Sequence, residues 1–173
     1  DVTGNYTTIS GTIHDSITKA GITAAVCTIT GYTLPYDGQP HTATGSCLGL
    51  NGETLAGLDL GGTTHTDAGD YPGDTWTFTD VTGNYYNTSG TVHDSITSLD
   101  AVCTIDGYTG VYDGANHGAS GSCTGPGGIT LGGLDLGESF DNVPGGTANW
   151  TFSNPNVSNS PQSGSVKITI TPG

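Results

Sequence analysis

Apolar and polar residues alternate along short stretches of this chain, and glycine and proline separate the stretches. In residues 165–171, Val166, Ile168 and Ile170 alternate with polar residues. A period of two is typical of a strand that buries one face and exposes the other. The chain has 30 glycines and 8 prolines among 173 residues, so we expect short strands joined by turns and almost no helix.

Two aromatic pairs fit the same period. Trp76 and Phe78 share one parity, as do Trp150 and Phe152. Side chains two positions apart point to the same face of a strand. We therefore expect each pair to form the aromatic centre of a small core.

One strand pattern places a charge among the apolar positions. In TVHDSI, Asp94 lies between Val92 and Ile96 on the inward parity, and Asp15 stands at the matching place in TIHDSI. A carboxylate at such a position predicts a β-bulge or a deliberately charged edge strand.

The chain also repeats itself. Residues 1–18 and 80–97 are identical at 14 of 18 positions. AVCTITGY at residues 25–32 returns as AVCTIDGY at residues 101–108, an offset of 76, and the YDG, GSC and LDLG segments keep this offset. Internal similarity at a fixed period is the signature of tandem structural units.

The order of the repeated segments divides the chain into three parts. Residues 24–98 and 99–173 each open with the AVC strand and close with the strand that follows a Ser-Gly pair. Residues 1–23 match only the closing segment of a unit. They are either the end of a preceding unit in a longer array, which we favour, or a strand that pairs with a neighbouring subunit.

The four cysteines lie at equivalent places in the two units. Cys27 and Cys47 are 20 residues apart, and so are Cys103 and Cys123. This spacing predicts one disulfide per unit, each contributing roughly 3 kcal/mol through loop closure. A zinc site would need paired ligands at short spacing, and the sequence has no CxxC or HxxxH. Disulfides imply an oxidising compartment outside the cytoplasm.

The charge of the chain excludes two classes of partner. The chain has sixteen acidic residues and only two basic ones, which gives a net charge of -14. Such a chain lacks the basic surface that nucleic acid requires, and it is repelled by anionic membranes. No run of about 18 apolar residues occurs, so we expect no membrane insertion.

A set of short motifs occurs twice in the same order: GY followed by YDG, then H-x-A-x-G, L-x-L-G, W-T-F and a closing strand that begins SGxV. The closing strand reads SGxVxI in the second copy and SGTVHDSI in the first. Together these motifs resemble the YDG/MBG-type immunoglobulin-like repeats found in tandem on large bacterial surface proteins. The resemblance covers residues 25–97 and 101–173, and it extends to the tail of a preceding copy. The cysteine pairs and the HDSI segments depart from the common pattern.

The resemblance implies an all-β fold of two tandem immunoglobulin-like β-sandwich units, plus an N-terminal strand that belongs to a preceding or neighbouring unit. It also implies an extracellular or cell-surface stalk or adhesin, and it carries over no catalytic residues. We expect a structural protein that forms a filament or stalk by head-to-tail assembly with further copies of itself, with no enzymatic activity and no cofactor.

The histidines do not change that expectation. His14 and His93 each precede an aspartate, and His41 and His117 follow the two YDG turns. Catalysis would need a nucleophile and an oxyanion site to converge on such a pair, and the sequence has no G-x-S-x-G, P-loop or HExxH motif. We expect these side chains to stabilise turns and strand ends.

An adhesin that binds carbohydrate or a host protein is the alternative function. Four tyrosines flank the YDG turns and would form a stacking platform, although packing at the end of the sandwich is the simpler role. They are Tyr32, Tyr36, Tyr108 and Tyr112.

Two further kinds of site have weaker support. Asp67, Asp70 and Asp74 crowd one acidic stretch and would offer oxygen ligands to calcium, but the stretch is not repeated in the second unit. Four N-x-S/T sequons are candidates for glycosylation: Asn5, Asn87, Asn149 and Asn156.

Overall fold

The computed structural model describes residues 4, 7, 9–18 and 26–173. Over these residues the chain forms fifteen β-strands, two single-turn 3₁₀ helices and no α-helix. The expected all-β class is confirmed, and the arrangement of several small sheets is consistent with a β-sandwich-like fold.

We call residues 26–98 the first unit. Its elements are β1 (Cys27–Thr30), β2 (Thr33–Pro35), β3 (Thr44–Cys47), β4 (Leu58–Asp59), η1 (Gly61–Thr63), β5 (Gly69–Phe78) and β6 (Thr88–Thr97). One sheet pairs β1 with β3, and the other has the order β2-β6-β5-β4. The closing strand β6 therefore lies inside its sheet, antiparallel to β5 and parallel to β2.

We call residues 99–173 the second unit. Its elements are β7 (Val102–Asp106), β8 (Tyr108–Val111), β9 (His117–Gly118), β10 (Ser120–Thr124), η2 (Pro126–Gly128), β11 (Thr130–Leu131), β12 (Leu134–Asp135), β13 (Ser139–Phe140), β14 (Gly145–Phe152) and β15 (Gln162–Thr171). The order β12-β14-β15-β8 repeats that of the first unit, with β15 parallel to β8. The sheet β11-β10-β7 contains the counterpart of the β1-β3 pair.

Each unit has its own core. The buried residues of the first include Trp76 and Phe78, and those of the second include Phe152 and Leu131. In β15, Ile168 and Ile170 are buried while Val166 is half-buried, so the alternation in the sequence is realised in the sheet. The period-two pattern thus supplies the inward face on which each unit folds.

The charged position in the closing strand does not lie at a sheet edge, and the irregularity beside it lies in the neighbouring strand. Asp94 is fully buried in β6. The interpretation as an edge strand is wrong, because β5 and β2 flank β6 on both sides. The irregularity lies in β5 instead, where the register shifts between Tyr71 and Asp74, directly beside Asp94.

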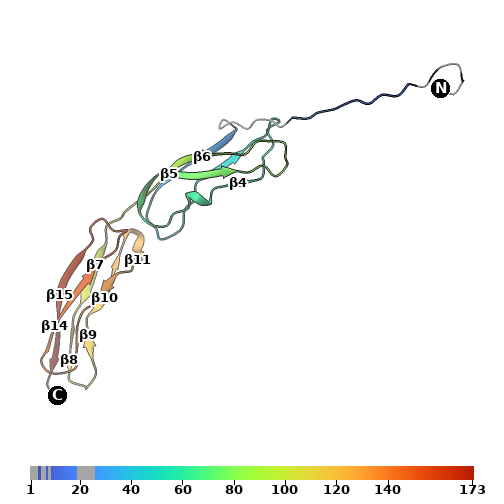
Figure 1. Ribbon diagram of the computed structural model, residues 1–173. Coiled ribbons are helices and arrows are strands. Elements are labelled where there is room, and N and C mark those ends of the chain that lie inside the picture. Colours follow the sequence, from blue (N-terminus) through green and yellow to red (C-terminus); the bar gives the residue numbers. More distant parts are fainter. Residues whose placement is uncertain (1–3, 5–6, 8, 19–25) are drawn as a thin grey trace.

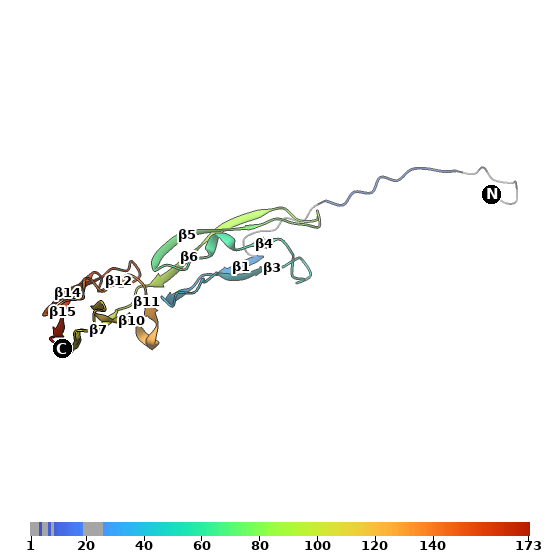
Figure 2. The ribbon, with the colours of Figure 1, turned by 90° about the horizontal axis from the view of Figure 1, so that it is seen from below.

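The two units follow one another along an elongated molecule, and the C-terminus lies at the far end of the second unit (Figures 1 and 2). Residues 9–18 extend away from the first unit in both views. Ile13 and Ile17, which match Val92 and Ile96 of β6, are 88% and 96% exposed. This described part of the leading segment pairs with no strand, and the rest of residues 1–23 lies outside the described residues.

Candidate functional site

The structure contains the two disulfides that the sequence predicts, Cys27–Cys47 and Cys103–Cys123. In each, the two cysteines stand directly opposite one another on paired antiparallel strands, β1 with β3 and β7 with β10. Each disulfide therefore joins two neighbouring strands. Disulfides persist in oxidising environments, which favours a location outside the cytoplasm.

The aromatic pairs lie where the parity predicts. Trp76, Phe78 and Phe152 are buried, and Trp150 is half-buried. The indole of each tryptophan lies over a glycine of the closing strand. A Cβ atom at Gly90 would come within 2.6 Å of Trp76, so the Ser-Gly pair in both repeats makes room for the ring.

A cluster of ionisable side chains lies inside the first unit. The imidazole Nε2 of His65 is 2.7 Å from Oδ2 of Asp74. The backbone N–H of Tyr32 donates to Oδ1 of Asp94 at 2.9 Å, whereas Oδ2 of Asp94 has no hydrogen-bond partner in the described part of the chain. The ring of Tyr71 stacks on His65 with 3.5 Å between centroids.

Burial raises the pKa of the Asp94 carboxyl, and the nearby Asp74 carboxyl raises it further. The second unit has no such cluster. Its strand register places apolar residues at all three positions: Phe140 for His65, Ala148 for Asp74 and Ile168 for Asp94. One β-sheet framework therefore carries an ionisable interior in the first unit and an apolar one in the second.

The histidines after the YDG turns stabilise those turns. Nε2 of His41 lies 2.9 Å from Asp37, and Nε2 of His117 lies 3.0 Å from Asp113. A backbone N–H donates to each aspartate as well, and these hydrogen bonds lower the pKa of both carboxyls. His93 similarly pairs with an aspartate across the strands β5 and β6.

The four tyrosines do not gather on one surface. The hydroxyl of Tyr32 lies within hydrogen-bond distance of two backbone carbonyls, and Tyr108 stacks on His117 with centroids 3.9 Å apart. Tyr36 packs against the core cluster of the second unit. Only Tyr112, 51% exposed, offers a largely open ring among the four.

The three carboxylates of the acidic stretch do not converge on one point. Asp67 accepts a hydrogen bond from Asn156, Asp70 pairs with His93, and Asp74 pairs with His65. Over residues 9–18 and 26–173, no group of three or more potential metal ligands converges. The three carboxylates lie within eight residues of the sequence, but each contacts a different side chain.

The sequons differ in their accessibility. Asn87 and Asn149 are exposed, while Asn156 is buried and Asn5 lies outside the described residues. The side chain of Asn149 already contacts Glu138, whose pKa is lowered chiefly by the hydrogen bond from the Asn149 backbone N–H. Glycosylation of Asn156 would disrupt the contact described next.

Asn156 connects the two units, a role that the sequence analysis missed. Its Oδ1 accepts a hydrogen bond from the backbone N–H of Ala68 at 2.6 Å, and its Nδ2 donates to Asp67 at 3.1 Å. Leu99 donates its backbone N–H to the carbonyl of Asn156. Because Thr97 ends β6, only Ser98 separates that strand from Leu99, which is already bound to the second unit.

A different loop occupies the corresponding end of the first unit. Asp80 accepts hydrogen bonds from the backbone N–H groups of Thr82 and Tyr85, and from the Thr82 hydroxyl. Burial opposes ionisation of Asp80, but these donors outweigh it and lower the pKa of the carboxyl to about 2. In the sequence, the only visible signal for the junction is that NPN replaces DVT in the second copy of this loop.

Within the described residues, no helix is long and apolar enough to cross a membrane. Comparisons of the chain with protein-family models and with curated proteins found no match.

Proposed function

We propose that this chain is a stalk segment or structural subunit of an extracellular bacterial filament or surface appendage, with its units joined head to tail. The observation that supports it most directly is the junction at Asn156. Its buried side chain bonds to both a backbone N–H and a carboxylate of the preceding unit. Interdomain contacts of this kind fix the direction in which one unit follows the next.

The short connection supports the same role. Ser98 alone separates the last strand of one unit from the first bonded residue of the next. A linker this short cannot let the units rotate freely, because the reach of a chain scales with its number of residues. The elongated arrangement in Figure 1 is what a spacer requires.

The disulfides suit a molecule under tension. The loop closed by Cys27 and Cys47 contains β2, the parallel neighbour of the closing strand β6, and the second unit encloses β8 in the same way. Tension on the chain ends cannot extend a covalently closed loop. Each closing strand is therefore paired with a strand that the disulfide protects.

The surface composition is consistent with an exposed, hydrated stalk. Only 10% of residues are charged, nearly all of them acidic. Hydroxyl and amide groups keep such a surface in solution, and the scarcity of lysine and arginine removes cleavage sites for trypsin-like proteases.

Immuno-electron microscopy of the source cells, with antibodies against residues 26–173, tests the proposal. We expect label outside the cell, along surface appendages. Label confined to the cell interior, or spread in the medium without any appendage, would contradict it.

A further inference from the structure

The end of the first unit where β6 finishes contacts the second unit. A pocket there is lined by Ala68, Ile96 and Ser98 of the first unit and by Pro155 of the second. Tyr36 lies at the same end and packs against the core cluster of the second unit. Together with Asn156, these contacts define a docking surface that is already occupied.

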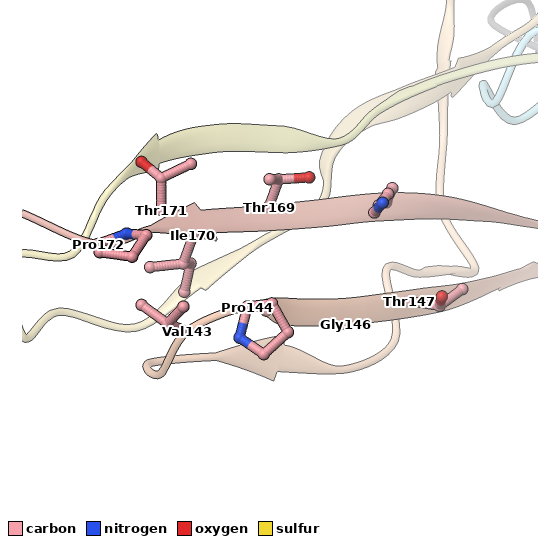
Figure 3. Close-up of a pocket in the computed structure, with 10 residues that line it drawn as sticks. Val143, Pro144, Gly146, Thr147, Thr169, Ile170, Thr171 and Pro172 are labelled. Carbon is pink, nitrogen blue, oxygen red and sulfur yellow. The ribbon is translucent and has the colours of Figure 1, made fainter.

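The second unit carries the same surface at its own end, where β15 finishes. Its pocket, of about 400 Å³, is lined by residues that include Val143, Pro144, Ile170 and Pro172 (Figure 3). The strand register shows the correspondence. Gly145 pairs with Thr169 in the second unit as Asp70 pairs with Ser95 in the first. This equivalence places Val143 at the position of Ala68 and Ile170 at that of Ile96.

This second surface is apolar and open. Val111, Tyr112 and Val143 are 57%, 51% and 44% exposed. Tyr112 is the counterpart of Tyr36, which is half-buried at the junction. Val143 lines the pocket, and Val111 and Tyr112 lie beside Thr171, which also lines it. Neighbouring exposed apolar side chains mark a site of interaction.

The polar contacts of the junction also have counterparts here. Asn142 stands at the position of Asp67, and its amide oxygen can accept a hydrogen bond as that carboxylate does. The backbone N–H of Val143 stands at the position of the Ala68 N–H that donates to Asn156. An incoming asparagine would meet one acceptor and one donor in the same arrangement.

The geometry points to a further repeat unit of this type, continuing the chain after Pro172 and presenting its own Asn-Pro-Asn loop, as the occupant of this surface. The inference rests on the proposed function and specifies the contact by which such a stalk propagates. In the first unit, Ser98 stands at the position of Pro172, and Leu99 directly after it is bonded to the following unit.

A second copy of the chain fits less well. Its first unit presents Thr82 where the second unit presents Asn156. If the first unit of a second copy docked here, residues 9–18 of that copy, which match the closing strand, would fall in the place of β15. That place, between β14 and β8, is already filled. A separate copy would have to displace that strand before docking.

The test extends the full chain by repeating residues 99–173 directly after Pro172. With ¹⁵N labelling, we expect the amide resonances of Val143, Gly145 and Ile170 to shift relative to the unextended chain. We also expect the relaxation rates of the second and appended units to show common tumbling. Shifts limited to the last two residues, with independent tumbling, would overturn the inference.

Asn156→Ala in the appended unit should restore the resonances of the unextended chain, whereas Asn116→Ala there, an exposed asparagine away from the loop, should leave the shifts in place. If both variants keep the shifts, the asparagine contact is wrong. A second arm adds unlabelled full chain to labelled full chain. The same shifts in that mixture would assign the surface to a separate copy instead.

These outcomes differ from a failure of the proposed function. Independent tumbling would contradict the docking contact but would leave the appendage labelling unchanged. Absence of appendage labelling would contradict the proposed stalk function without affecting the spectra.

Discussion

The positions of Asp94, His65 and Asp74 carry ionisable side chains in the first unit and apolar side chains in the second. Replacing a buried ionic cluster with well-packed apolar residues is often stabilising, by about 1–4 kcal/mol. The second unit already shows that phenylalanine, alanine and isoleucine fit these positions.

We therefore expect His65→Phe, Asp74→Ala and Asp94→Ile together to raise the unfolding free energy of the first unit by about 1–4 kcal/mol. Denaturant titration of the full chain would measure it. The reverse change, Ile168→Asp, buries a carboxylate without a partner and should destabilise the second unit by at least about 2 kcal/mol. A triple variant less stable than the original would show that the cluster holds the first unit together.

The Asp94 carboxyl should also make the stability of the first unit depend on pH. Burial raises the pKa of this carboxyl in the folded state above the unfolded value of about 3.9. Its contribution to the unfolding free energy is therefore fully present below the unfolded pKa and is lost as the pH rises through the folded pKa. Asp94→Asn cannot ionise. We expect its unfolding free energy to exceed that of the original chain at pH 7 and the difference to shrink as the pH falls toward 4. A constant difference over this range would contradict the raised pKa.

The sequence predicted part of this cluster. Parity alone placed Asp94 on the inward face, and burial confirms it. The meeting of Asp94 with His65 and Asp74 depends on the register of β5 against β6 and on the shift after Tyr71. A local pattern contains no information on register between distant strands, so the cluster could not be read from it.

At the scale of elements, the GY motif has a steric explanation. A Cβ atom at Gly107 would lie 2.1 Å from the backbone carbonyl oxygen of Lys167, and Gly31 meets His93 in the same way. The motif therefore allows β8 and β2 to approach the closing strands.

We expect Gly107→Ala to push β8 away from β15 and to lower the unfolding free energy by about 1–3 kcal/mol, the usual cost of overpacking. Gly132→Ala is the matched control, because nothing lies within 4 Å of a Cβ atom there. Chemical denaturation of both variants compares them. Equal stability of the two would show that the sheet absorbs the added methyl without separating.

An alternating pattern forms a strand in this structure only where neighbouring strands are present. The alternation in residues 165–171 matches the buried face of β15. The leading segment carries nearly the sequence of β6, yet its described residues 9–18 are exposed and unpaired. The same residues form a strand only where two neighbouring strands receive them, because an isolated strand leaves its backbone groups and apolar face in water.

At the scale of the whole molecule, the equal cysteine spacing in the two repeats predicted the two disulfides, because tandem copies reproduce the same contacts. The order of the strands in the sheets was not predicted. The junction could not be predicted in this way. It depends on Asn156, Asp67 and Tyr36, three residues from different loops that meet only when one unit is placed on the next.

The disulfides make a quantitative prediction for a chain under tension. Each closes 20 residues. At about 3.3–3.6 Å per extended residue, less the 4.0 Å already spanned between the cysteine Cα atoms, reduction should release roughly 65 Å of extra contour length per unit.

Single-molecule stretching of the full chain between end-attached handles measures this length. Under oxidising conditions we expect two unfolding events, each shortened by the closed loop, and with reductant both should lengthen. Cys27→Ser with Cys47→Ser should lengthen one event only, since the second unit keeps its disulfide. An unchanged length on reduction would mean that tension does not pass across the closed loops, and the disulfides would then have no part in limiting extension.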